Sequence, residues 1–138
     1  MAGAKFQQIV DLEEWNQMMK ESSKNEMIYV LDVYKDWCGP CTVMRFFFDQ
    51  LMNSEAKVEQ RVGFYNVDQE LVADQIKEIL PRWSNVNIDT KGCCPLFMFI
   101  QKGEIVAEVN GCDSPEVMRQ IMDFIPPVPV EKREDNSP

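Results

Sequence analysis

The chain has 138 residues, 45% of them hydrophobic, and a formal net charge of −9 at pH 7. This composition supports one compact domain with its own core, and the negative charge argues against nucleic acid or an anionic membrane as a partner. The chain contains no histidine, which excludes Ser-His and Cys-His catalysis and histidine-bound metals. Residues 1–5 lack the apolar core of a signal peptide and no stretch approaches membrane-spanning length, so we expect a soluble cytoplasmic protein.

Hydrophobic spacing and end signals predict alternating strands and helices along most of the chain. The first helix is expected to begin after Asp11, and the last after Asp113 or Ser114, with Pro115 in its first turn. Lys102-Gly103 is expected to close a hairpin. In chain order we predict strands at 6–10, 27–34, 62–67, 95–100 and 105–109, and helices at 12–19, 43–53, 69–80 and 115–125.

This order predicts an α/β fold in which helices flank both faces of a mixed central sheet. We place the domain at residues 1–125 and a proline-rich, charged tail at residues 126–138. The segment Arg82–Gly92 shows no clear period. Three consecutive phenylalanines at 46–48 cannot all face the core from one helix, so we expect one of them to be exposed.

The sequence Trp37-Cys38-Gly39-Pro40-Cys41 lies where the second predicted strand turns into a helix. Gly39 permits a tight turn, and Pro40 is tolerated in the first turn of a helix. The positive end of the helix dipole and its unpaired N–H groups stabilise a thiolate at Cys38. Cys41 follows one helical turn later, so Cys38 is the candidate nucleophile and Cys41 the candidate resolving thiol.

A pair of cysteines at this spacing could also be half of a zinc site or a static disulfide. A zinc site needs a second pair of ligands, and a static disulfide does not suit a chain without a secretory signal. We therefore expect a redox pair, no metal and no cofactor. Adjacent Cys93 and Cys94 can bridge only through a strained ring, so we expect one to pack and the other to be an additional thiol, with Cys112 inert.

The order of elements, with the Trp-Cys-Gly-Pro-Cys motif at the end of the second strand, resembles thioredoxin over residues 6–125. The resemblance implies exchange with the thiols and disulfides of other proteins, with Cys38, Cys41 and Asp32 as catalytic residues. Asp32, six residues before Cys38, matches a buried acid that assists proton transfer at the resolving thiol.

The same resemblance implies a substrate groove beside the motif. Pro95 matches a cis-proline that faces the disulfide and binds substrate backbone, and Gly111 matches a glycine lining the groove. The implied groove residues are Trp37, Gly39, Pro40, Cys94, Pro95 and Gly111.

Several positions depart from the usual thioredoxin pattern. Phe64 and Thr42 stand where lysines are common, and Cys94 precedes Pro95 where threonine, isoleucine or valine is usual. The segment between Asp68 and Pro95 is also longer than a minimal thioredoxin needs, and long irregular loops in compact domains are often functional.

A narrower resemblance is to the thioredoxin-type light chains of flagellar outer-arm dynein and to thioredoxin modules fused to nucleoside diphosphate kinase domains. It rests on the run from Asp32 to Cys41 and on a cysteine just before Pro95. Since this length holds no kinase module, it implies a light chain with a redox or sensing role in the axoneme of a cilium or flagellum, bound to the dynein heavy chain or other motor subunits. The alternative is a free cytosolic thioredoxin that reduces many protein disulfides.

Overall fold

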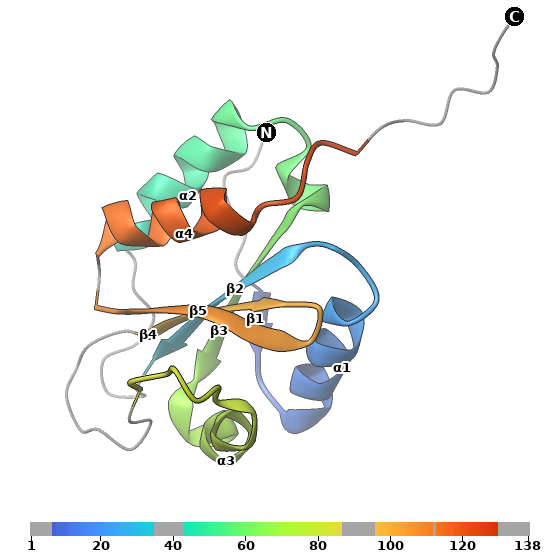
Figure 1. Ribbon diagram of the computed structural model, residues 1–138, viewed down its shortest axis with the longest axis vertical. Coiled ribbons are helices and arrows are strands. Elements are labelled where there is room, and N and C mark those ends of the chain that lie inside the picture. The colour runs from blue at the N-terminus through green and yellow to red at the C-terminus, as the bar shows by residue number, and fades with distance from the viewer. Residues whose placement is uncertain (1–6, 35–42, 87–95, 112, 130–138) are drawn as a thin grey trace, which may run out of the picture.

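The computed structural model describes residues 7–34, 43–86, 96–111 and 113–129. The predicted order of strands and helices is confirmed within these residues (Figure 1). A short 3₁₀ turn at Val58–Gln60 lies between the second helix and the third strand. The elements are β1 (Gln7–Ile9), α1 (Leu12–Ser22), β2 (Ile28–Tyr34), α2 (Val43–Ser54), β3 (Val62–Asp68), α3 (Gln69–Ile79), β4 (Leu96–Gln101), β5 (Glu104–Asn110) and α4 (Ser114–Phe124).

The five strands form one mixed sheet in the order β1-β3-β2-β4-β5. The β1–β3 and β2–β3 pairs are parallel, whereas the β2–β4 and β4–β5 pairs are antiparallel. The predicted α/β fold with a mixed sheet is therefore confirmed. The hairpin between β4 and β5 turns at Lys102 and Gly103, which both have positive φ, as in the two-residue turns that match strand twist.

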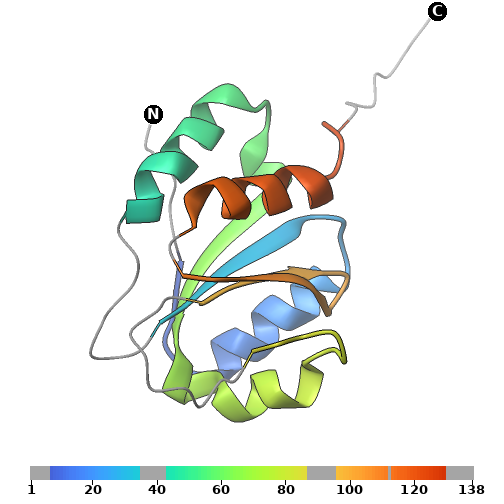
Figure 2. The same cartoon turned by 60° about the vertical axis from the view of Figure 1, so that its left-hand side comes forward.

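Helices cover both faces of the sheet, with α2 and α4 on one side and α1 and α3 on the other (Figure 2). Each face has its own hydrophobic cluster. The α2–α4 cluster includes Phe48 from α2 and Ile121 from α4, and the α1–α3 cluster includes Trp15 from α1 and Ile76 from α3. The sheet thus separates two cores.

The central strand β2 supplies side chains to both cores. Ile28 and Val30 belong to the α2–α4 cluster, while Tyr29, Leu31 and Val33 belong to the α1–α3 cluster. Side chains alternate between the faces of a strand, so a strand covered on both faces needs a continuous apolar run. This explains why residues 28–34 are apolar or aromatic except for Asp32.

Aspartates begin three of the helices. Asp11 accepts a hydrogen bond from the Glu14 backbone N–H at 2.8 Å, and Asp68 accepts one from Glu70 at 2.9 Å. For α4 the cap is Asp113 rather than Ser114. These bonds satisfy N–H groups that have no partner within the helix.

The three consecutive phenylalanines of α2 differ in burial, as expected. Phe48 is fully buried and its ring lies 4.6 Å from that of Phe64, whereas Phe46 is 61% exposed. The apolar sequence of α4 also predicts that Met122 faces the core together with Val117 and Ile121, and this is wrong, because Met122 is 47% exposed. Successive helical residues are about 100° apart, so Met122 falls off the stripe that contains Ile121.

The start of the C-terminal tail is tied to the domain. The buried Arg61 donates from Nε to the carbonyl oxygen of Pro126 at 2.8 Å and from Nη1 to the carbonyl oxygen of Ala56 at 2.9 Å. Its Nη1 also lies 3.2 Å from Oε1 of Glu55. The predicted domain boundary at residue 125 is not tested by this contact and stays a prediction. The contact shows that Pro126, the first residue of the tail, accepts a hydrogen bond from the buried Arg61.

Candidate functional site

Most of the predicted site residues lie outside the described part of the chain. Residues 35–42 carry the Trp-Cys-Gly-Pro-Cys motif, namely Trp37, Cys38, Gly39, Pro40 and Cys41. Residues 87–95 carry Cys93, Cys94 and Pro95, and Cys112 is also outside the described ranges. Asp32 and Gly111 are described, together with the elements that flank the motif.

Those flanking elements converge at one end of the sheet. β2 ends at Tyr34 and α2 begins at Val43, which agrees with a motif between a strand and a helix. Leu96 at the start of β4 pairs with Val33 near the end of β2 and with Asn110 at the end of β5. The chain positions next to the motif, next to Pro95 and next to Gly111 are therefore neighbours.

Asp32 lies in β2, close to this end of the sheet. It is 1% exposed and shares its sheet face with Ile28 and Val30, which face α2 and α4. Phe97 is its register partner on β4. The predicted burial of Asp32 is therefore confirmed. Its side chain is on the sheet face covered by α2, the helix that follows the motif.

A second buried polar side chain lies beside Asp32 and was missed from the sequence. Asn66 is 7% exposed and is the register partner of Asp32 on the parallel strand β3. Among the described residues its Oδ1 has no hydrogen-bond partner. The alternation Val62, Phe64, Asn66 already placed this amide on the face toward α2 and α4, but the strand register was needed to place it next to Asp32.

The lysine position of the family pattern is occupied by a core residue. Phe64 is buried and packs against Phe48 of α2 on the same face as Asp32. An aromatic ring fills the space with apolar surface and brings no positive charge. Gly111 has a φ of +90°, a conformation that favours glycine, and a Cβ added there would meet no atom of the described residues within 4 Å.

The segment before residue 87 is anchored to β5. Glu108 accepts hydrogen bonds from Ser84 Oγ at 2.6 Å and from the Asn85 N–H at 2.8 Å. Ser84 Oγ in turn accepts from the Val86 N–H at 3.1 Å. This part of the segment Arg82–Gly92, which showed no period in the sequence, is therefore held by a carboxylate from another element.

We expect Asp32→Asn to raise the free energy of unfolding at pH 8 by about 1–3 kcal/mol. Burial disfavours a charged carboxylate, and the new amide could donate to the buried Oδ1 of Asn66 on the neighbouring strand. Urea denaturation of both proteins at pH 8 measures the difference. Asn66→Ala in the Asp32→Asn background should remove part of the gain, and an unchanged or lower stability of Asp32→Asn would contradict the argument.

The described residues hold neither a metal site nor a membrane-spanning helix. They contain no group of three or more Cys, Asp or Glu side chains placed to hold a metal ion. None of their helices has the length and apolar character needed to cross a membrane.

Comparison with known proteins identifies the class. The sequence model of the thioredoxin family matches residues 6–124, which is most of the chain. The chain therefore belongs to the thioredoxin family, as the motif and the order of elements predicted.

Individual relatives agree with this assignment. The chain is 29% identical to thioredoxin H1 of Arabidopsis thaliana over 110 residues, covering 80% of this chain and 84% of that protein. It is also 29% identical to human thioredoxin domain-containing protein 3 over 111 residues, covering 80% of this chain but only 16% of that protein. The crystal structure of thioredoxin NaTrxh from Nicotiana alata matches the fold with a TM-score of 0.66 at 20% identity, over 91% of this chain and 97% of that one.

Proposed function

We propose that this thioredoxin-like redox protein exchanges disulfides through Cys38 and Cys41. The observation that carries the proposal is the burial of Asp32 in β2, two residues before the strand ends, on the face toward α2, in a chain that belongs to the thioredoxin family. An acid in that position is a proton acceptor close to where the motif leaves the strand. Trp37, Gly39, Pro40, Cys94, Pro95 and Gly111 are the proposed groove.

The proposed reaction proceeds in two exchange steps. The Cys38 thiolate attacks one sulfur of a substrate disulfide, a mixed disulfide forms, and the other substrate sulfur leaves as a thiolate. Cys41 then loses its proton to the Asp32 carboxylate and attacks Cys38 Sγ, which releases the second substrate sulfur as a thiolate and closes the Cys38–Cys41 disulfide. Two electrons pass from the protein to the substrate, and a separate thiol reductant must return them. On this mechanism Asp32→Asn should slow turnover, because an amide cannot accept the proton.

We further propose that the protein is a light-chain subunit of an outer-arm dynein. The support is the run from Asp32 to Cys41, the cysteine before Pro95, and two surface features beyond what disulfide exchange requires. These are the exposed Phe46 on α2 and the proline-rich tail that leaves the domain at Pro126. A free protein-disulfide reductase fits the family assignment equally well and is the alternative.

Truncating the tail separates these two alternatives. The truncation must keep Pro126, because its carbonyl oxygen accepts a hydrogen bond from Arg61. Deleting residues 126–138 removes the Pro126 carbonyl oxygen that accepts from buried Arg61, so we expect a loss of about 1–3 kcal/mol in unfolding free energy. Deleting residues 128–138 keeps that oxygen and should change stability by less than about 0.5 kcal/mol. Urea denaturation of the two truncated proteins measures this difference.

Deletion of residues 128–138 then tests binding to the dynein complex without changing the stability of the domain. If the tail is a docking segment, protein lacking residues 128–138 should reduce insulin at the normal rate but rebind poorly to salt-extracted ciliary axonemes. Equal rebinding of both forms would remove the tail from the proposal. If neither form bound, the light-chain proposal would fail and the free reductase would remain.

A further inference from the structure

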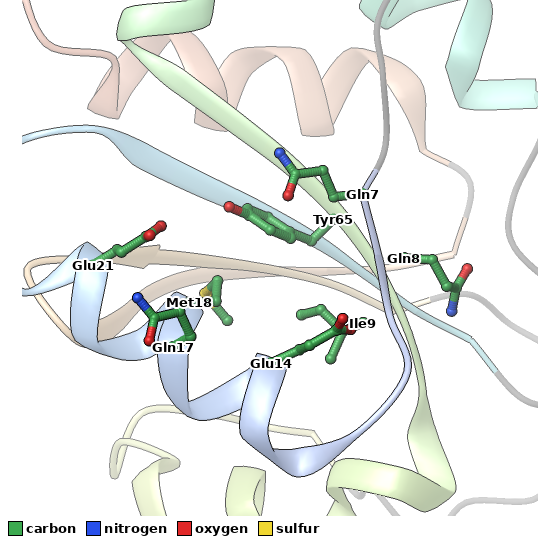
Figure 3. Close-up of a pocket in the computed structure, with 8 residues that line it drawn as sticks. All are labelled: Gln7, Gln8, Ile9, Glu14, Gln17, Met18, Glu21 and Tyr65. Carbon is green, nitrogen blue, oxygen red and sulfur yellow. The ribbon is translucent and has the colours of Figure 1, made fainter.

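A pocket of about 190 Å³ lies between α1 and the edge of the sheet formed by β1 (Figure 3). This is the sheet face opposite α2 and Asp32, so the pocket is separate from the proposed redox site. Its floor includes the buried Ile9 and Met18. Its other lining residues are polar or aromatic: Gln7, Gln8, Glu14, Gln17, Glu21 and Tyr65.

The charged side chains among the described residues that line the pocket are both acidic. Glu14, Gln17 and Glu21 lie on one side of α1 because their spacing of three and four residues matches the helical turn. Neither lysine nor arginine is among the described residues that line the pocket. Two carboxylates therefore face a hollow without a counter-charge from its lining.

The pocket is preformed by contacts on both sides. Glu14 is held by two hydrogen bonds at the start of α1: its Oε1 accepts from the N–H of Val10, the residue before the N-cap, at 2.8 Å, and its own N–H donates to Oδ1 of the N-cap Asp11. The Tyr65 ring stacks on that of Tyr29 with centroids 5.8 Å apart. Burial, together with the nearby Tyr29 and the charge of Glu21, raises the pKa of Tyr65 to about 12, so the phenol stays protonated.

The pocket is also next to the edge strand β1. β1 is at one end of the strand order and has β3 as its partner. β1 has three residues, and so short a strand limits pairing at an edge, but it contains no proline or charged residue that would block pairing. Val10, just beyond it, is an exposed hydrophobic residue. A strand added along β1 would direct every second side chain to the α1 face, where the pocket lies.

We propose that this pocket binds an arginine or lysine side chain from an extended, basic segment of a partner protein that pairs along β1. The apolar floor suits the alkyl stem of such a side chain, and the two carboxylates and the Tyr65 ring suit its charged head. The volume is too small for a drug-sized ligand, which needs roughly 300–1,000 Å³. Phosphate-bearing partners are disfavoured by the same carboxylates and by the net charge of −9.

The test uses synthetic peptides that alternate valine with arginine, and matched peptides with neutral citrulline in place of each arginine. Binding to the full chain is followed by fluorescence anisotropy at low salt and by amide NMR shifts. We expect the arginine peptide to bind, to shift the amides of Gln7–Ile9, and to weaken as salt is added. The citrulline peptide should bind more weakly. Because no readout uses disulfide exchange, the result is independent of the redox proposal.

Paired substitutions separate the pocket from overall charge. Glu14→Gln with Glu21→Gln removes both carboxylates, and the amide oxygen of glutamine at 14 can still accept from the Val10 N–H. Glu13→Gln with Glu78→Gln makes the same charge change at exposed positions outside the pocket. We expect the first pair to weaken peptide binding about fivefold or more and the second less than about twofold. Equal losses from both pairs, shifts confined to other elements, equal binding of the citrulline peptide, or no binding of the arginine peptide would each overturn the proposal.

Discussion

Cys38→Ser should abolish disulfide reduction, and Cys41→Ser should instead accumulate a mixed disulfide with the substrate. A serine at 38 leaves no thiolate to attack, whereas a serine at 41 leaves the first step intact and blocks the second. β2 ends at Tyr34 and α2 begins at Val43, so the expected thiolate at Cys38 is close to the start of a helix. Insulin reduction with a chemical reductant measures activity, and nonreducing gels with mass spectrometry detect the trapped adduct.

The order of thiol reactivity provides a separate test of these roles. With limiting iodoacetamide, Cys38 should be alkylated before Cys41, because the thiolate is the reactive form. Cys112→Ser serves as a control and should leave both results unchanged. Preferential labelling of Cys41, or an adduct trapped by Cys38→Ser, would reverse the assignment of the two cysteines.

Phe48→Ala should lower the free energy of unfolding by about 3–5 kcal/mol. Phe48 is 0% exposed and its ring packs against Phe64 between α2 and the sheet, so truncation leaves a cavity in the α2–α4 core. A loss of this size is a large part of the roughly 5–15 kcal/mol that stabilises a typical domain. Urea denaturation monitored by circular dichroism would measure it.

Phe46→Ala provides the matched control on the same helix. Phe46 is mostly exposed and makes an edge contact with Phe47 at 5.4 Å, so its truncation should change stability by less than about 1 kcal/mol. The comparison keeps the chemical change constant and varies only burial. Similar losses from both substitutions would mean that α2 is rotated relative to the sheet from the orientation described above.

The sequence predicted the order of elements because the relevant signals are local. The apolar run of β2 follows from its burial on both faces, and Asp11 and Asp68 cap helices within three residues of themselves. The expected burial of Asp32 came with the resemblance to thioredoxin, and its position among the apolar residues of β2 agrees with it. The error at Met122 arose because apolar character was assigned to the core without following the helical stripe.

The contacts that sequence could not provide join distant parts of the chain. Asn66 lies beside Asp32 only because β2 and β3 pair in one particular parallel register. The bond from Arg61 to Pro126 joins residues 65 positions apart. The pocket beside β1 likewise needs α1 and the sheet to be packed together, and no periodicity in the sequence indicates a hollow there.

The separation of the two cores by the sheet has a consequence for protein engineering. Asp32 and Asn66 are on the α2–α4 face, whereas the pocket beside β1 and its carboxylates are on the α1 face. A library that varies exposed positions of α1 can therefore alter binding while the layer beneath the motif keeps its packing. The fold allows recognition and redox chemistry to be redesigned on opposite sides of one scaffold.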